Sequence, residues 1–431
     1  MMIYFFIYSD FRLNLYISLA KAYERKGYEI FFVVQDTLSL SKLKRTKFKK
    51  RLIEFPYYKN KKLSRSNLEH YKDRLKMNTD VLSKNIGLEQ SAYLYHCMVD
   101  FIIKLNPDSE TIFFAGNGVH VQDIALKDLK SKYAYRTVFT ELANIDNRVF
   151  FDPIGSNCHS LFYKMDELDN YYKGESESHE KWKAEYIKNK IEMHIVRQAK
   201  RMSILDKVRY YKSTLIDLLR NRPSYPALRI RSGYTKYKIF GKKETHKSGE
   251  IPRLNYCNDL PENYLFFPLQ VTNDAQILIN SNYDNYLALD YYKQQAEKNG
   301  LELVVKIHPA ERNIDFIKNI VEKSKTKGFY LSNENTFSLI INSQQVGVNN
   351  STVGFESIIC NKETTFLGKT FYSKLLDDEW FGFYIFNYLF KADFFSGEIY
   401  ETDVIGKISF YFNLEDNFYM SQKRNIRFDE Q

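Results

Sequence analysis

The chain has 431 residues, of which 44% are hydrophobic and 27% are charged, and its formal net charge is +10. This length favours two domains over one, and the balance of apolar and charged residues is that of a folded protein, which excludes a disordered chain. The 4 cysteines are scattered, which excludes a disulfide framework, and no apolar run approaches the roughly 20 residues of a membrane span.

The N-terminal residues alternate between strand and helix patterns. Residues 3–8 form an apolar run of strand length, residues 11–26 have helical periodicity, and residues 28–34 form a second apolar run. Gly27 suits the end of the helix. This order predicts the start of a doubly wound domain. Because the first run is short and charged residues follow it, we interpret it as a strand rather than a signal peptide and expect a cytoplasmic protein.

Two further strand patterns end in polar residues. Residues 111–115 are followed by Gly116, Asn117 and Gly118, and residues 136–140 are followed by Glu141. Glycine at a strand end lets the backbone approach a ligand closely, although a tight turn explains the pattern equally well. A carboxylate in this place is either a site residue or a capping or solvated charge, and the sequence leaves both alternatives open.

Residues 181–247 form a strongly basic segment. It contains 19 Lys and Arg against 5 Asp and Glu, a local net charge of +14, so the rest of the chain carries −4. Such an excess indicates an anionic partner: a membrane surface, an acidic glycan or a nucleic acid. A stripe along one long helix is predicted by the apolar residues Ile187, Ile191, Ile195, Ala199, Met202, Leu205 and Val208. We interpret the stripe as packed on its own domain, with an interfacial helix on anionic lipid as the alternative. Residues 220–249, with several Pro and Gly, are interpreted as a linker or mobile loop.

The second half contains three signatures of one kind, each a strand-length apolar run that stops at polar residues. They are residues 264–276, 303–309 and 346–356. The segments between them, residues 283–299 and 312–325, have helical length and spacing. This alternation predicts a parallel sheet whose strands end at one edge, where ligands bind.

The polar residues that follow these three strands suit a phosphate group. We expect Asp274, His308 and Ser351 to converge at the edge of the sheet. Pro309 fixes the turn after its strand and aims the imidazole of His308 out of the sheet. Lys306 and His308 suit a phosphate, and a hydroxyl ahead of a helix adds a second anion site. The sequence therefore predicts a nucleotide-sugar pocket.

The domain boundaries follow from these patterns. We expect an N-terminal acceptor-side Rossmann-like domain over residues 1–250 that includes the basic insertion, and a nucleotide-sugar-binding Rossmann-like domain over residues 255–400. A closing helix is expected within residues 401–431, after an aromatic stretch, residues 371–395, that favours a buried helix pair. Two doubly wound domains that face each other across a cleft are typical of the GT-B glycosyltransferases, so the predicted fold is α/β and GT-B-like.

Several common motifs are missing from the sequence. It contains no Gly-x-x-x-x-Gly-Lys loop and no Gly-x-Gly-x-x-Gly, which excludes the P-loop and dinucleotide interpretations. No Asp-x-Asp motif of metal-dependent transferases is present. We therefore expect no metal and no cofactor, and side chains and helix dipoles would neutralise the leaving group.

Taken as a set, the signatures resemble the capsule polysaccharide biosynthesis family, the retaining β-Kdo transferases of the KpsS and KpsC type. The resemblance covers about residues 3–367. It rests on residues 266–276, 306–309 and 350–356 and, in the N-terminal half, on Asn117-Gly118, Glu141 and Asp152-Pro153-Ile154-Gly155-Ser156-Asn157. Departures from the family's pattern occur at Ser9-Asp10, at Asn361-Lys362-Glu363 and in the long basic insertion, and they concern the acceptor more than the donor.

The resemblance implies a CMP-Kdo donor, CMP as leaving group and retention of the β configuration. It implies a nucleophile at Asp274, a base for the acceptor hydroxyl at Glu141, and contact of His308 with the donor phosphate. An N-cap is the alternative role of Asp274. The implied donor-binding residues are Gln270, Gln276, Lys306, Pro309, Ser351, Thr352 and Glu356. The implied acceptor-side residues are Asn117, Gly118, Asp152 and Asn157.

The implied acceptor is a phosphatidylglycerol-type lipid or a glycan of the cell surface, and the basic segment fits an anionic lipid. Expected partners are a CMP-sugar, an anionic membrane surface and capsule assembly proteins, without nucleic acid, and the expected location is peripheral on the inner face of the cytoplasmic membrane. Two alternatives stay open. One is a transferase that uses another CMP-sugar, such as a sialic acid, and the other is a non-enzymatic basic protein that binds membranes or nucleic acid.

Overall fold

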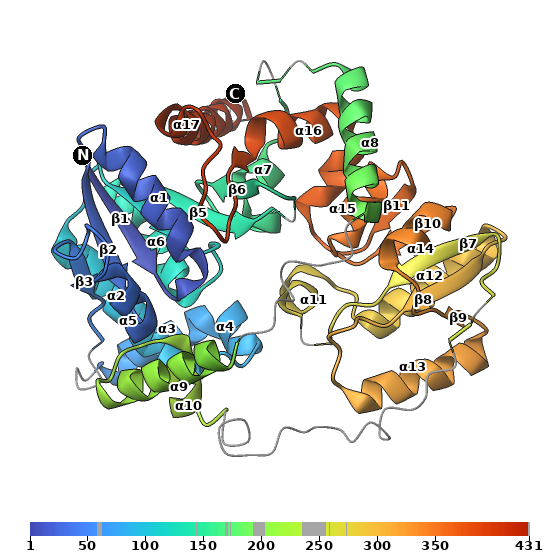
Figure 1. Cartoon of the computed structure of the whole chain (residues 1–431), viewed down its shortest axis with the longest axis horizontal. Helices are drawn as coiled ribbons and strands as arrows, with labels where there is room; N and C mark the ends of the chain where they lie inside the picture. Colours follow the sequence, from blue (N-terminus) through green and yellow to red (C-terminus); the bar gives the residue numbers. More distant parts are fainter. Residues whose placement is uncertain are drawn as a thin grey trace. The chain divides into compact units, whose positions relative to one another are not determined.

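The computed structural model describes residues 1–57, 63–143, 145–168, 171–172, 174–192, 203–234, 256–257, 259–272 and 274–429. The chain forms two compact units, each built on its own sheet (Figure 1). Unit 1 comprises Met1–Glu167, Arg201–Lys236 and Tyr388–Gln431, and unit 2 comprises Leu168–Lys200 and Tyr237–Asn387. Neither unit is continuous in sequence, whereas the domains expected from the sequence are continuous. Unit 1 includes the C-terminal segment, which returns to the first sheet.

Unit 1 is built on a sheet with the strand order β12-β6-β5-β4-β1-β2-β3 in the described residues. The strands from β3 to β5 in this order are parallel, and β6 runs antiparallel to both of its neighbours. The order places a topological switch point between β1 and β4. The strands are β1 (Met2–Ile7), β2 (Glu29–Val34), β3 (Leu52–Glu54), β4 (Ile112–Ala115), β5 (Arg136–Leu142), β6 (Arg148–Asp152) and β12 (Phe390–Lys391).

Helices cover both faces of this sheet, so its strands are apolar at nearly every position. In β1, Tyr4 and Phe6 pack on one face against the buried residues of α5 and α6. The ring of Phe5 points to the other face and contacts Tyr16 of α1, with 5.3 Å between ring centroids. The helices are α1 (Leu13–Glu24), α2 (Thr37–Leu43), α3 (Arg65–Leu75), α4 (Thr79–Leu82), α5 (Leu88–Leu105), α6 (Val121–Tyr133), α7 (Leu161–Lys164), α9 (Ile204–Leu219), α10 (Tyr225–Arg231) and α17 (Val404–Asp429), with short 3-10 turns at Asp10–Arg12 and Asn157–His159.

Unit 2 repeats this order on a smaller scale. Its strands are all parallel and lie in the order β11-β10-β7-β8-β9, so the switch point falls between β7 and β10. When the strands are counted from the first strand of each unit, β11-β10-β7-β8-β9 in unit 2 has the same order as β5-β4-β1-β2-β3 in unit 1. The strands are β7 (Tyr264–Pro268), β8 (Glu302–Lys306), β9 (Tyr330–Leu331), β10 (Gln345–Val348) and β11 (Glu363–Phe366).

Alternate side chains of β7 enter the two halves of the unit 2 core. Leu265 and Phe267 pack with residues of α12 and α13, while Tyr264 and Phe266 pack with residues of α14. A strand buried on both faces reads as a continuous apolar run, which is the pattern found in the sequence. The helices are α8 (Ser176–Glu192), α11 (Ala275–Asn280), α12 (Asn285–Lys298), α13 (Ile314–Lys327), α14 (Thr336–Asn342), α15 (Val353–Ile359) and α16 (Asp378–Gly382).

The predicted α/β class with two doubly wound units is confirmed by the two strand orders. The expected closing helix is present as α17, which packs in unit 1 through a Lys130–Glu415 ion pair with α6 and an Arg136–Asp416 ion pair with β5. The aromatic stretch differs from the expected helix pair. It forms a 3-10 turn (Phe371–Leu376), the short α16 and a π-helical turn (Phe383–Tyr388) before β12.

The prediction of one long helix through the basic segment is wrong. The described part forms α8 in unit 2 and α9 in unit 1. Ser203 has an extended backbone and accepts a hydrogen bond from the amide of Asp206, so it starts a new helix as an N-cap. Ile195, Ala199 and Met202 lie outside the described residues. The expected linker also contains a helix, α10, because a proline in the first helical turn costs no hydrogen bond.

Candidate functional site

The three signatures of the second half meet at the carboxyl edge of the unit 2 sheet. Buried Gln270 joins two of them, because its Nε2 donates to Asn350 Oδ1 at 3.2 Å and to Asp274 Oδ2 at 3.4 Å. The amide of Asn350 donates back to Gln270 Oε1 at 3.3 Å. The signature of β8 is tied in by Glu311, whose Oε2 accepts from the Thr272 amide at 2.7 Å. Asp274, His308 and Ser351 therefore belong to one edge, beside the switch point.

Asp274 is half-buried and lies at the N-cap of α11. Its Oδ1 accepts from the Gln276 amide at 2.9 Å, while its Oδ2 accepts from Gln270. The N-cap role considered as an alternative is thus observed. It also fixes the direction of the carboxylate, and a fixed carboxylate at a ligand-binding edge is what a nucleophile requires.

His308 lies two residues past the end of β8 and is exposed. Its Nδ1 accepts a hydrogen bond from the Ala310 amide at 3.0 Å, so a neutral ring carries its proton on Nε2. Partial desolvation of the ring is the largest effect on the pKa of His308 and lowers it, while the Asp274 and Glu311 carboxylates oppose that effect. A neutral imidazole with an outward N–H can donate a hydrogen bond to a phosphate oxygen.

The other residues expected on the donor side are held in different ways. Lys306 is buried and its Nζ donates to the carbonyl of Glu334, so its ammonium is engaged within the unit rather than exposed. Ser351 Oγ accepts from the Val353 amide at 3.2 Å. Glu356 pairs with Lys190 of α8 at 3.0 Å. Gln276 is half-buried, and its Oε1 accepts a hydrogen bond from Asn280. Pro309 and Thr352 are exposed.

Among the residues expected on the acceptor side or as the base, Glu141 is the last residue but one of β5 and is half-buried. Its Oε2 accepts from Asn117 Nδ2 at 2.8 Å and its Oε1 from the Leu142 amide at 2.9 Å. Gly118 has φ of +82°, and a Cβ there would lie 2.8 Å from the Cα of Gly155. Only glycine fits this loop, which brings Asn117 to the carboxyl edge next to Glu141.

Asp152 is not available to an acceptor in this fold. It is fully buried, and its two oxygens accept hydrogen bonds from the amides of Ile154, Gly155 and Phe162 and from the hydroxyl of Tyr388. A buried carboxylate needs donors of this kind, and here they organise the turn after β6. Asn157 follows that turn in the left-handed region, with φ of 48°, and is half-buried.

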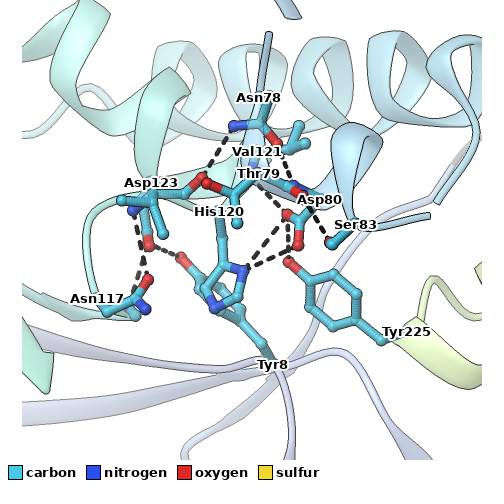
Figure 2. Close-up of polar contacts among 12 residues, drawn as sticks. Tyr8, Asn78, Thr79, Asp80, Ser83, Asn117, His120, Val121, Asp123 and Tyr225 are labelled. Atoms are coloured by element: carbon cyan, nitrogen blue, oxygen red, sulfur yellow. Dashed lines mark hydrogen bonds and ion pairs between the residues drawn. The ribbon is translucent and has the colours of Figure 1, made fainter. Parts of the chain in front are cut away.

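The sequence reasoning missed a polar cluster at the edge of unit 1 (Figure 2). His120, just before α6, places its Nδ1 3.1 Å and 3.3 Å from the two oxygens of Asp80. Asp80 lies in α4, forty positions earlier in the chain. The one signal in the sequence was the position of His120 two residues after Gly118, at the end of a strand.

The described residues contain neither a helix that could span a membrane nor a cluster of metal ligands. None of their helices combines the length and apolar content that crossing a membrane takes. No group of three His, Cys, Asp or Glu side chains among them is arranged to hold a metal ion.

Comparisons with known proteins give one family and a set of remote structures. Protein FixF of Sinorhizobium fredii is 32% identical over 120 residues, which cover 27% of this chain and 29% of that protein. Two solved structures show low similarity. The β-Kdo 2,7 transferase of Thermosulfurimonas dismutans KpsC has 16% identity and a TM-score of 0.31, with 64% of this chain and 70% of that chain covered. The UDP-GlcNAc 2-epimerase of Methanocaldococcus jannaschii has 12% identity and a TM-score of 0.28, with 87% and 86% covered.

Since these TM-scores are below 0.5, the fold class rests on the strand orders and the family on sequence. A family model described as "Capsule polysaccharide biosynthesis protein" matches residues 181–375, the range that contains all three signatures of unit 2. The resemblance seen in the motifs is thus confirmed, and over residues 181–375 the chain is similar to the capsule polysaccharide biosynthesis family.

Proposed function

We propose that this protein is a glycosyltransferase that takes Kdo from CMP-Kdo and transfers it with retention to a lipid or glycan acceptor in capsule synthesis. The observation that supports this most directly is the Gln270 network, which fixes Asp274 at the same edge as His308. A carboxylate held beside a phosphate-binding imidazole would repel a bound phosphate, so its position there is consistent with a chemical role.

In the proposed first step, a carboxylate oxygen of Asp274 attacks the anomeric carbon, and the bond from that carbon to the phosphate oxygen breaks. CMP leaves with the electron pair, and Nε2–H of His308 donates to the phosphate oxygens on which charge accumulates. In the second step, an acceptor hydroxyl attacks the same carbon and releases the carboxylate. A base must take the proton of that hydroxyl, and the resemblance assigns this task to Glu141.

Two measurements test this proposal. Thermal unfolding with CMP, UDP, GDP and ADP should show selective stabilisation by CMP, because a bound ligand shifts stability by mass action. Intact-protein mass spectrometry after incubation with CMP-Kdo alone should show one added Kdo, which peptide mapping should place on Asp274. CMP-sialic acid in the same assay distinguishes the alternative donor. Absence of stabilisation by any nucleotide would favour the non-enzymatic alternative.

We further propose that α9 brings the enzyme to an anionic membrane. The inner face of this helix is polar: Ser213, Thr214 and Asp217 are buried, and Asp217 accepts hydrogen bonds from Thr37 of α2. The outer face is apolar, and more than half of the surface is exposed in Ile204, Leu205, Val208, Tyr211, Leu215 and Leu219. Lys207, Arg209 and Lys212 are also exposed on this helix. An outward apolar face with cations beside it is typical of helices that lie in a lipid interface.

Sedimentation with vesicles tests this membrane proposal. Binding to phosphatidylglycerol vesicles should exceed binding to phosphatidylcholine vesicles and should weaken with salt, because exposed charges are screened over roughly 8 Å at physiological ionic strength. Leu215→Glu should reduce binding, whereas Leu287→Glu on α12 should not, although the two leucines are 56% and 55% exposed. Equal binding to both vesicle types, or equal effects of the two substitutions, contradicts the proposal.

A further inference from the structure

The cluster in Figure 2 joins a buried carboxylate to a partly exposed imidazole. The side chain of Asp80 is 0% exposed and that of His120 is 21% exposed. Besides His120, Asp80 Oδ2 accepts from the Val121 amide at 3.1 Å and from the Tyr225 hydroxyl at 2.9 Å. Donors surround this carboxylate on both oxygens, so it can stay ionised although it is buried.

The electrostatics of the pair follow from this arrangement. Burial acts to raise the pKa of Asp80, but the charge and hydrogen bond of His120 and the other donors outweigh it and lower the pKa. Burial acts to lower the pKa of His120, but Asp80 outweighs it and raises the pKa. The groups that face the ring come from five elements: Asp80 of α4, Asp123 of α6, Tyr8 after β1, Tyr225 of α10 and Arg12 of the first 3-10 turn.

The ring of His120 is fixed in orientation by its neighbours. It contacts the rings of Tyr8 and Tyr225, with centroids 5.9 Å and 5.4 Å away. Since Nδ1 faces Asp80, the neutral ring carries its proton there, and Nε2 is the nitrogen with an unused lone pair. In the described part of the chain Nε2 has no hydrogen-bond partner, and the side chain retains exposed surface. This is the arrangement of an oriented general base.

The position of the pair in the fold also points to a ligand. His120 lies in the loop after β4 and Tyr8 directly follows β1, so the ring lies at the switch point of the unit 1 sheet. Asp123 holds this loop by accepting from the amides of Gly116 at 3.1 Å and Gly118 at 2.9 Å and from the Tyr8 hydroxyl at 2.7 Å. The side chain of Asn117 in the same loop contacts Glu141.

Glu141 is held differently from His120. Each of its oxygens already accepts a hydrogen bond, from Asn117 and from the Leu142 amide. It can orient a hydroxyl, whereas His120 has a nitrogen that no described group engages. We propose that His120, positioned by Asp80, is the catalytic base that takes the proton of the acceptor hydroxyl, and that Glu141 orients that hydroxyl. This proposal rests on the proposed transferase function.

The step balances as follows. The oxygen of the acceptor hydroxyl forms a bond to the anomeric carbon while its proton moves to Nε2 of His120. The bond between the anomeric carbon and the Asp274 oxygen breaks, and the electron pair returns to the carboxylate. His120 then releases the proton to water, while Asp80 stays ionised and stabilises the imidazolium. No metal or oxidant is consumed.

The test separates the two half-reactions. The variants are His120→Asn, whose amide can still donate to Asp80, together with Asp80→Asn, Glu141→Gln and the control His96→Asn. His96 is a matched control because it also faces an aspartate, Asp100 at 3.9 Å, and its side chain is 20% exposed. Each protein is loaded with CMP-Kdo, and mass spectrometry follows formation of the adduct and its decay in water and with phosphatidylglycerol micelles.

We expect His120→Asn to form the adduct at the wild-type rate and to discharge it on the order of 10²–10⁴-fold more slowly, in water and with micelles alike. In the wild type the discharge rate should rise with pH through the pKa of His120. Asp80→Asn should move that midpoint to lower pH, an effect that a purely structural role would not produce. Glu141→Gln should slow discharge less than His120→Asn, and His96→Asn should match the wild type.

Normal discharge in His120→Asn, or a larger defect in Glu141→Gln, overturns the assignment. A wild-type protein that forms no adduct overturns the donor and the two-step route instead. Histidine NMR without substrate then tests the Asp80–His120 pair. The proposal requires Nδ1–H in the neutral ring of His120 and a pKa of His120 that falls in Asp80→Asn. A neutral ring protonated on Nε2, or a pKa unchanged by Asp80→Asn, removes the proposal.

Discussion

The two sheets share one order over five strands, and each carries a histidine and a carboxylate at its carboxyl edge, yet the two pairs are built in opposite ways. In unit 1 the carboxylate of Asp80 is buried and contacts His120 directly, which raises the pKa of the ring. In unit 2 Asp274 is half-buried and bonded to an amide and a glutamine, while His308 accepts from a backbone amide and its pKa is lowered. One edge suits proton uptake, and the other suits hydrogen-bond donation to a phosphate beside a separate carboxylate.

The hydrogen bond at Nδ1 determines which nitrogen of each neutral ring carries the proton. A carboxylate at Nδ1 of His120 stabilises the charged ring and leaves Nε2 as an acceptor. A backbone N–H at Nδ1 of His308 favours the neutral ring and leaves Nε2 as a donor. The same residue type at the carboxyl edges of two sheets therefore supports two roles, and the predictions below separate them.

The largest expected effect is that of Asp274→Ala. Loss of the nucleophile should reduce turnover by about 10⁴-fold or more and abolish the adduct, because no other group then forms the intermediate. Loss of the N-cap alone costs about 1 kcal/mol of stability and leaves the protein folded. Asp284→Ala, which removes the cap of α12 on the same unit, is the matched control. Normal transfer by Asp274→Ala would falsify the double displacement.

His308 should show a smaller loss with a specific pattern. His308→Ala should slow adduct formation by about 10²–10³-fold, the usual cost of one donor to developing charge. His308→Gln, whose amide can donate from the position of Nε2, should recover part of the rate. Since the pKa of His308 is lowered and the neutral ring is the active form, adduct formation should not fall as pH drops from 8 to 7. If these variants lose adduct discharge rather than adduct formation, the roles proposed for His308 and His120 are wrong.

The inner strands of both sheets were predictable from sequence because they are buried on two faces and read as continuous apolar runs; these strands are β1, β2, β4 and β5 of unit 1 and β7, β8 and β10 of unit 2. The unit 2 edge was also predictable, since Asp274, His308 and Ser351 each follow such a run directly. The Asp80–His120 pair was not, because Asp80 comes from a four-residue helix in a polar stretch and only the tertiary fold brings it to the sheet edge.

Two other differences between sequence and structure have separate causes. Asp152 looks like an edge carboxylate in the sequence but is enclosed by donors that come partly from Tyr388, far along the chain. Periodicity through the basic segment suggested one helix, because a repeat of apolar residues does not show where Ser203 caps and restarts the chain. The first feature depends on a long-range contact, and the second depends on a local cap that apolar periodicity does not reveal.

Asp36 provides a test of how burial affects a carboxylate that follows a strand of the unit 1 sheet. It follows β2, caps α2 through Ser39, and its Oδ2 has no hydrogen-bond partner among the described residues. Burial is the largest effect and raises the pKa of Asp36 from 3.8 to about 6. A raised pKa in the folded state means that its contribution to stability is complete below about pH 4 and is lost as pH rises through about 6.

Asp36→Asn keeps a capping oxygen and removes the charge, so it should stabilise unit 1 by up to about 3 kcal/mol at pH 8 and have little effect at pH 4. Thermal unfolding at the two pH values measures this difference. Asp10→Asn, which removes a carboxylate paired with Lys42 at 2.8 Å, should give no such gain. Destabilisation by Asp36→Asn at both pH values would show that the cap outweighs the buried charge.

The smallest expected effect compares two glutamines, one buried at each edge. Gln270 holds Asp274 and Asn350 in unit 2, and Gln122 bonds to Gln35 at 2.9 Å and accepts from Tyr225 at 3.1 Å in unit 1. Either substitution by Ala should cost about 1–3 kcal/mol, since each leaves buried polar partners without a bond. Only Gln270→Ala should also weaken stabilisation by CMP, because only Gln270 supports the edge assigned to the donor. Thermal unfolding of both variants with and without CMP measures this. An equal loss of CMP stabilisation in the two variants would mean that the nucleotide does not distinguish the two edges, and the division of roles between them would then fail.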